Sequence, residues 1–215
     1  MMTTIKPRIV NLVGAGSIGS FTDFLLAIMG RNIPTHLLIW DYDKVEPHNQ
    51  VNQLYRSEDA ECCSPISFKV DALKEILGKF SNVDILVFKD KVGEETELRG
   101  NTVVMVDSLE ERRKIFKAVK YRASVPLYID ARSGGERAVV YAFDPRDIDQ
   151  VLRYEKTLEG YGSPAPCANP DTIPTLFAIA SVIARMLDEF TKSKVAIFTE
   201  VLINFSRIPI IQVVP

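Results

Sequence analysis

The chain has 215 residues, 47% of them hydrophobic and 25% charged, which is the size and composition of one ordinary globular domain with a substantial core. The formal net charge is −2, with 26 basic and 28 acidic residues mixed along the chain. This balance gives no electrostatic reason to expect a nucleic acid or an anionic membrane as a partner, and we predict neither.

The sequence also predicts a compartment. The first 16 residues lack the charged start, long apolar stretch and cleavage site of a signal peptide. No segment approaches the roughly 20 apolar residues needed to span a bilayer. Three cysteines (Cys62, Cys63 and Cys167) leave an odd thiol in any pairing scheme, which fits a reducing compartment. We therefore expect a cytoplasmic protein.

Apolar β-rich runs alternate with longer segments of helical spacing over most of the chain. In chain order the pattern predicts a strand at 8–13, a helix at 17–29, a strand at 35–40, a helix at 69–80, strands at 83–88 and 102–106, a helix at 110–121 and a strand at 125–129. Such alternation indicates βαβ units, and strands this apolar belong in a parallel sheet covered on both faces. We expect a Rossmann-like, doubly wound α/β fold with a mostly parallel sheet.

The last third of the chain has a different pattern. Arg132-Ser133-Gly134-Gly135 is typical of a turn, and 137–143 is a β-like run that could extend the sheet antiparallel. Residues 144–171 lack a convincing periodicity and indicate a functional loop or a crossover. A helix is predicted at 172–190, with Pro174 in its first turn, followed by antiparallel strands at 195–204 and 208–214. We interpret 1–215 as a single nucleotide-binding domain, with a core at about 8–143 and the crossover loop, helix and C-terminal strands at about 144–215.

Gly14-Ala15-Gly16-Ser17-Ile18-Gly19 follows a predicted strand and opens a predicted helix, the context in which a G-x-G-x-x-G pattern binds phosphate. Gly14 permits the tight turn, Gly16 lets the backbone approach a phosphate, and Gly19 lets the helix pack on the strand. Asp41 ends the second predicted strand, where a carboxylate can accept hydrogen bonds from ribose hydroxyls. The alternatives are a tight turn without a ligand and an Asp that only caps a strand end.

The segment after the second strand, Trp40-Asp41-Tyr42-Asp43-Lys44-Val45-Glu46-Pro47-His48-Asn49, resembles the D-x-D-x-V-E-x-x-N signature of the ThiF/MoeB (ubiquitin-activating-enzyme-like) superfamily. Further matches follow in order at Gln53, Lys69, Asp107 and Arg112. The resemblance spans about residues 9–137 and is weaker at Pro166-Cys167 and the helix after it.

This resemblance implies an ATP-dependent adenylyltransferase that acts on a carboxylate, such as the C-terminus of a small ubiquitin-like or sulfur-carrier protein. It implies a nucleotide site made of Gly14, Gly16, Ser17, Gly19, Asp41, Asp43 and Lys69. It further implies catalytic roles for Asn49, Lys69 and Asp107, with Asp107 holding Mg²⁺. From composition alone, Lys69 could be a solvated lysine at a helix start, and Asp107 could cap the helix that follows it.

The sequence departs from the family at several positions. The family has an arginine three residues after the signature Asn, where this chain has Asn52; Arg56, or an arginine of another subunit, is the candidate to replace it. Family zinc sites use two Cys-x-x-Cys pairs, which this chain lacks, so we predict no zinc. Cys167 is a candidate thiol nucleophile, although an inert loop thiol is the favoured interpretation.

Two other functions stay open at this point. A non-catalytic nucleotide-binding or interaction module of the same fold is suggested by Asn52. An NAD(P)- or FAD-dependent oxidoreductase is favoured only by the glycine loop and Asp41. We also expect a homodimer, because family members commonly dimerise and the apolar C-terminal strands offer edges that need cover.

Overall fold

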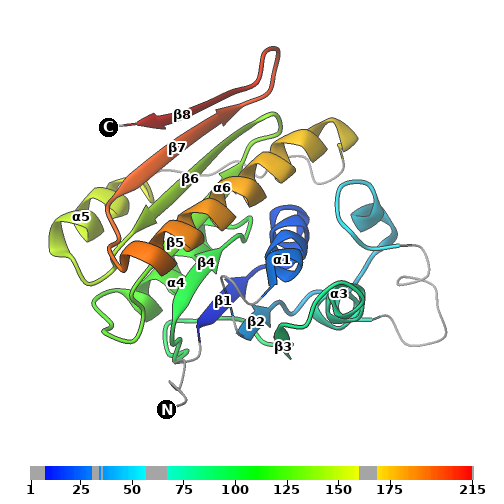
Figure 1. Cartoon of the computed structure of the whole chain (residues 1–215), viewed down its shortest axis with the longest axis horizontal. Coiled ribbons are helices and arrows are strands. Elements are labelled where there is room, and N and C mark those ends of the chain that lie inside the picture. The colour runs from blue at the N-terminus through cyan, green and yellow to red at the C-terminus, as the bar shows by residue number, and fades with distance from the viewer. Residues whose placement is uncertain (1–7, 31–33, 35, 57–66, 160–168, 215) are drawn as a thin grey trace.

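The computed structural model describes residues 8–30, 34, 36–56, 67–159 and 169–214. Within them one eight-stranded sheet runs in the order β3-β2-β1-β4-β5-β6-β7-β8 (Figure 1). The first five strands along the chain pair in parallel: β1 (Ile9–Val13), β2 (His36–Trp40), β3 (Asp84–Phe88), β4 (Asn101–Val104) and β5 (Tyr128–Ser133). The last three add antiparallel pairs: β6 (Arg137–Phe143), β7 (Thr199–Asn204) and β8 (Ile210–Val214). The predicted fold class is confirmed.

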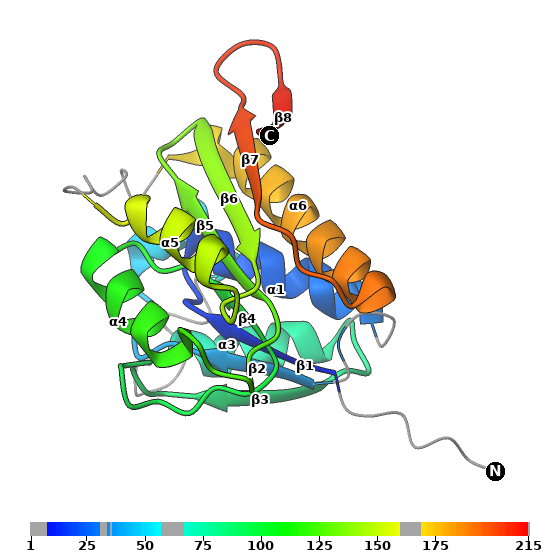
Figure 2. The same cartoon turned by 90° about the vertical axis from the view of Figure 1, so that its left-hand side faces the viewer.

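Helices cover both faces of the sheet, as the apolar parallel strands require. One face carries α1 (Ser17–Met29), α3 (Lys69–Gly78) and α6 (Ile173–Ser193), and the other carries α4 (Leu109–Val119) and α5 (Ile148–Lys156) (Figures 1 and 2). Two short 3-10 helices, η2 (Pro47–Gln50) and η3 (Pro170–Thr172), precede α3 and α6 in the chain.

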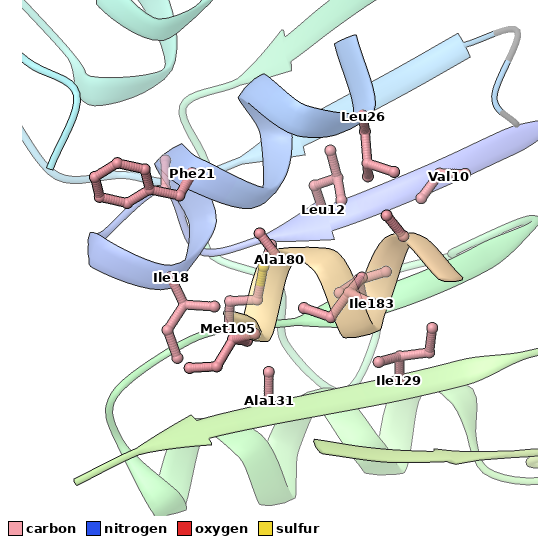
Figure 3. Close-up of a cluster of buried hydrophobic side chains, with 14 of the residues drawn as sticks. Val10, Leu12, Ile18, Phe21, Leu26, Met105, Ile129, Ala131, Ala180 and Ile183 are labelled. Carbon is pink, nitrogen blue, oxygen red and sulfur yellow. The ribbon is translucent and has the colours of Figure 1, made fainter. Parts of the chain in front are cut away.

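The larger core cluster lies where α1 and α6 pack against the sheet (Figure 3). Ile179, Ile183 and Leu187 recur every four residues along α6 and are fully buried, so they form one continuous apolar stripe that faces the core. The α1–α6 contact includes the rings of Phe21 and Phe177, whose centroids are 4.8 Å apart. Each buried side chain of this size stabilises the fold by about 1.5–3 kcal/mol, and the stripe therefore fixes α1 and the loop that precedes it.

The strand order reverses beside β1, which lies between β2 and β4. In doubly wound sheets, ligands bind at the carboxyl ends of the strands at such a switch point. Here the Gly14 N–H donates to the Trp40 carbonyl (2.9 Å), and the Met105 N–H donates to the Val13 carbonyl (2.8 Å). The loops after β1, β2 and β4 therefore leave the sheet side by side.

Three predicted elements of the last third differ from the structure. The predicted strand 125–129 is wrong in position, because β5 begins at Tyr128 and includes Arg132 and Ser133, which we expected in a turn. The interpretation of 144–171 as irregular is wrong for 148–156, which form α5 behind the cap Asp147. Helix α5 has only nine residues, and the Pro- and Gly-containing stretches on both sides of it obscure its amphipathic pattern. The first C-terminal strand begins at Thr199 and not at residue 195.

Strands β3 and β8 are the edges of the sheet within the described residues, and the apolar residues of β8 are exposed: Ile210 (53%), Ile211 (53%) and Val213 (63%). Edges of this kind favour self-association. The homodimer stays a prediction that a molecular mass measured by light scattering would decide. No helix among the described residues is long and apolar enough to cross a membrane.

Asp23 on α1 is a polar exception inside the core. It is fully buried, and neither carboxylate oxygen has a hydrogen-bond partner within the described part of the chain. Burial raises the pKa of this carboxyl well above its ordinary value, and the nearby charge of Asp41 adds to the effect. The folded state therefore keeps the proton to a higher pH than the unfolded state does. The contribution of Asp23 to stability therefore falls as the pH rises from about 3.9, the pKa of an aspartate in the unfolded state, through the pKa of Asp23 in the folded state.

We predict that Asp23→Asn raises the free energy of unfolding at neutral pH by about 1–3 kcal/mol, or roughly 2–4 °C in melting temperature for each kcal/mol. The gain should shrink as pH falls and should level off below about pH 3.9, because the wild-type carboxyl then becomes protonated in the unfolded state as well as in the folded state. Melting curves across this range measure it, with the exposed Asp90 replaced by Asn as the control. A difference in melting temperature between Asp23→Asn and wild type that stays constant with pH would contradict the prediction.

Candidate functional site

The glycine loop joins β1 to α1 and leaves the start of the helix open. Gly14 has φ +100°, a left-handed conformation that side chains rarely adopt, and a Cβ at Gly19 would lie 2.0 Å from the Gly14 carbonyl oxygen. Gly16 is the N-cap of α1 and provides no side-chain hydrogen bond to the first turn. The amide groups of that turn are therefore available to an anion, the arrangement by which helix N-termini bind phosphate.

Asp41 ties this loop to the acidic segment after β2. Its Oδ2 accepts from the Ala15 N–H (2.6 Å) and its Oδ1 accepts from the Asp43 N–H (2.8 Å). Burial raises the pKa of the Asp41 carboxyl, while the two amide hydrogen bonds and the charge of Lys69 lower it. Each oxygen keeps lone-pair capacity for a further donor, which a ribose hydroxyl could supply.

Lys69 opens α3 and is buried, with only 7% of its surface exposed. Its Nζ donates to Asp43 Oδ2 (2.9 Å), and its backbone N–H donates to the Asp43 carbonyl (2.9 Å). The alternative of a solvated lysine is therefore wrong. The Asp43 carboxylate is half exposed and holds the Lys69 ammonium at a fixed position, and both residues line the same cavity.

Two asparagines follow on η2 and the turn after it. Asn49 accepts from the Glu46 N–H through Oδ1 (2.8 Å), which closes a capping box on η2. Asn52, at the position of the family arginine, is buried and accepts from Ser17 Oγ (3.1 Å). Its Nδ2 donates to Thr172 Oγ1 (3.4 Å). Asn52 therefore connects the start of α1 to η3, a structural role that an arginine could not repeat.

Asp107 lies in the loop between β4 and α4, and it is exposed. The helix after it begins at Leu109, and its N-cap is Ser108, whose Oγ accepts from the Glu111 N–H (3.3 Å). The alternative that Asp107 caps α4 is therefore wrong. Its carboxylate is left for another partner.

These segments surround one cavity of about 490 Å³. Most of the residues predicted from the sequence line it: Gly14, Gly16, Ser17, Asp41, Asp43, Asn49, Lys69 and Asp107. Gly19 lies behind the loop and supports its shape. Arg56 is exposed and is not among the lining residues. Cys167 lies outside the described residues, as do Cys62 and Cys63.

Arg112, one of the residues that match the family, belongs to a buried charge cluster at the cavity wall that sequence reasoning did not predict. Asp130 on β5 is fully buried between the guanidinium groups of Arg112 and Arg132. Arg112 also donates to the carbonyls of Val106 and Ala131. Burial lowers the pKa of Arg112 to about 10, so it is still charged at neutral pH. Arg112 and Tyr154 lie 18 and 24 positions from Asp130 in sequence, so no local motif signals that they meet it.

No group of three or more His, Cys, Asp or Glu side chains that could hold a metal occurs among the described residues. Since the cysteines lie outside them, the absence of zinc stays a prediction. A single carboxylate such as Asp107 fits Mg²⁺, which commonly uses one or two carboxylates together with phosphate oxygens and water.

No family model matches the sequence, and no curated protein matches it. Solved structures do match the fold. Escherichia coli MccB in complex with ATP matches with a TM-score of 0.64 at 18% identity, over 97% of this chain and 63% of that chain. MccB with AMPCPP and selenomethionine MccA gives 0.66 at 17%, over 97% and 63%. Selenomethionine PaaA gives 0.68 at 15%, over 97% and 72%.

These identities establish the fold alone. The predicted resemblance is therefore confirmed only as a likeness of fold, which this chain shares with MccB. The chain spans less than two thirds of the length of the MccB chains that it matches.

The glycine loop gives a matched pair of substitutions. Gly19→Ala places a methyl group against backbone that cannot move away, and overpacking of this kind costs about 1–3 kcal/mol or more. Gly16→Ala meets nothing within 4 Å and should leave stability within about 0.5 kcal/mol of wild type. Denaturant unfolding of both variants measures the difference. If the two variants lost equal amounts of free energy of unfolding, the loop geometry would be contradicted.

Proposed function

We propose that the protein binds ATP with Mg²⁺ and adenylates a carboxylate. One observation carries the proposal: the uncapped start of α1, the buried Lys69–Asp43 pair and the exposed Asp107 meet around a single cavity at the switch point of the sheet. The reaction requires neutralisation of the phosphate charge and a fixed orientation of the reacting groups, and these features could supply both.

The nucleotide would lie across the ends of β1, β2 and β4. The first-turn amides of α1 donate to phosphate oxygens, and Asp41 accepts from the ribose hydroxyls. Lys69 brings a fixed positive charge to the phosphates, and its pairing with Asp43 keeps the ammonium in one position. The solved complexes of MccB with ATP and AMPCPP, which share this fold, support a nucleotide in this site.

The chemistry is attack by a carboxylate oxygen on the α-phosphorus of ATP, with pyrophosphate as the leaving group. Mg²⁺ would neutralise charge on the phosphates when bound, and Asp107 is the residue that would hold it. Asn49 places its amide group at the same cavity, where it can orient an oxygen of the reacting groups.

The carboxylate would be the C-terminus of a ubiquitin-like or sulfur-carrier protein, or of a peptide. The complex of MccB with the peptide MccA supports a peptide chain as the partner. A terminus fits the geometry because the cavity opens to solvent and extends from the glycine loop to β5 and η3.

A non-catalytic nucleotide-binding module is the alternative that a specific observation favours. Asn52 replaces the family arginine, and its amide is engaged by Ser17 and Thr172. Phosphoryl-transfer arginines contribute factors of roughly 10³–10⁵ in rate. If no other cation supplies that charge, the protein binds ATP without turning it over.

We predict that ATP with Mg²⁺ raises the melting temperature, and that NAD and FAD at equal concentration do not. Lys69→Gln should weaken ATP binding about 10- to 100-fold, because charge-assisted hydrogen bonds contribute about 1.5–3 kcal/mol. Lys79→Gln, at the other end of α3 and exposed, is the control. Isothermal titration measures both variants. Tighter binding of NAD than of ATP would establish the oxidoreductase instead.

Turnover is tested separately by exchange of labelled pyrophosphate into ATP in the presence of ubiquitin-like and sulfur-carrier proteins. We expect exchange with a carrier that has a free C-terminus, and none when that carboxylate is blocked as an amide. Asp107→Asn should abolish both the exchange and the Mg²⁺ dependence of ATP binding. Intact ATP binding with no exchange for any carrier would favour the non-catalytic module.

A further inference from the structure

The cavity extends two strands beyond the glycine loop, from β1 across β4 to β5. Its far part is lined by Arg132 and Ser133 of β5, Gly135 of the following turn, Thr157 after α5 and Thr172 of η3. The proposed nucleotide site does not use these residues. Arg132 is the one cation among them.

The cluster that holds Arg132 carries an unbalanced positive charge. Asp130 provides one negative charge, which it shares between Arg112 at Oδ1 and Arg132 at Oδ2 (Nε to Oδ2, 2.6 Å). The third partner, Tyr154, donates its hydroxyl to Oδ2 (2.9 Å) and is neutral, because burial raises its pKa well above the ordinary value. One carboxylate between two guanidinium groups leaves a net charge of +1. Asp130 and Arg112 are buried, so solvent screens this charge weakly.

Arg132 is held rigidly and retains donors. Nη1 donates to the Thr157 carbonyl (2.7 Å) and Nη2 donates to Thr157 Oγ1 (2.9 Å), while the guanidinium lies over the ring of Tyr141 at 5.0 Å. Of the five N–H groups of an arginine, three are used among the described residues, which leaves one on each terminal nitrogen. The side chain is 21% exposed and faces the cavity. A fixed guanidinium with two remaining donors is suited to bind a carboxylate.

Five carboxylates of the chain line the cavity: Asp41, Asp43, Asp107, Glu111 and Glu159. Asp43 pairs with Lys69, Glu111 pairs with Lys91, and Asp41 accepts from two backbone amides. Asp107 and Glu159 are exposed, so water solvates them and screens their charge, whereas the positive cluster is anchored below the surface. Glu159 stands at the far part and would compete with an incoming anion. Its removal should therefore strengthen anion binding.

We propose that Arg132 is a specificity-determining residue that binds an acidic side chain next to the carboxylate that is adenylated. The inference rests on the proposed function and names its substrate class: a chain terminus with an Asp or Glu side chain at the reacting residue or beside it. The bound group is not the attacking carboxylate, because a guanidinium on that oxygen would lower its nucleophilicity. It is also not a phosphate of ATP, because Arg132 lies two strands away from the glycine loop.

The test uses two probes that differ only in one charged group, N-acetyl-Gly-Glu and N-acetyl-Gly-Gln. Each is titrated calorimetrically into the full chain saturated with Mg²⁺ and AMPCPP. We expect wild type to bind the Glu probe about 10-fold more tightly than the Gln probe, and Arg132→Gln to bind both equally. Glu159→Gln should keep or increase the preference. Arg146→Gln, whose arginine pairs with Asp144 on the surface, should not change it.

Folding of the variant is checked by its melting temperature. Asp130 keeps Arg112 and Tyr154 as partners when Arg132 is replaced, so the buried carboxylate stays paired and the cluster becomes neutral in Arg132→Gln. Arg132→Lys retains the charge without the paired donors and should keep part of the preference.

The inference is overturned if wild type binds the two probes equally or binds neither, or if the preference survives in Arg132→Gln. A loss of AMPCPP affinity in Arg132→Gln overturns it as well, because the arginine would then contact the nucleotide. Titration of AMPCPP alone into wild type distinguishes a failure of the proposed function from a failure of the role proposed for Arg132. Absence of nucleotide binding refutes the proposed function, whereas nucleotide binding without a probe preference refutes only the role of Arg132.

Discussion

The carboxylate of Asp41 joins the two segments on which the site depends. By accepting from Ala15 with one oxygen and from Asp43 with the other, it fixes the glycine loop against the acidic segment after β2. Asp43 in turn holds Lys69 at the start of α3. Three segments from separate parts of the chain thereby take one arrangement, and its geometry is set before any ligand arrives.

The sheet supplies the second constraint. Parallel strands β1 to β5 bring their carboxyl ends to one edge, so the segments after β1, β2 and β4 and the end of β5 line the same cavity. The packing of α6 on α1 keeps that edge rigid on one face. On β5 the buried Asp130 holds two arginines and a tyrosine, and this cluster extends the charged wall of the cavity beyond the nucleotide part. The fold thus separates a region suited to a nucleotide from one suited to an acidic chain terminus.

Much of this could be predicted from the sequence because it is local. The glycine loop, the apolar strands and the signature around Asp41 each lie within about ten consecutive residues. What was missed depends on distant contacts. Helix α5 has only nine residues and buries only Val151 and Tyr154, so it is held by its packing on the sheet. The place of β5 in the chain is set by its pairing with β4 and β6. Likewise, the sequence pattern places Arg132 in a turn, whereas in the structure its side chain is fixed by hydrogen bonds to Asp130 and Thr157.

The central claim is that one cavity at the switch point of the sheet receives a nucleotide. A crystal structure of the protein with Mg²⁺ and AMPCPP tests this most directly. The account predicts phosphate density over the amides of Gly16 and Ser17, ribose hydroxyls against Asp41, and a metal ion beside Asp107. A nucleotide bound elsewhere, or a cavity that stays empty at saturating nucleotide, would contradict it.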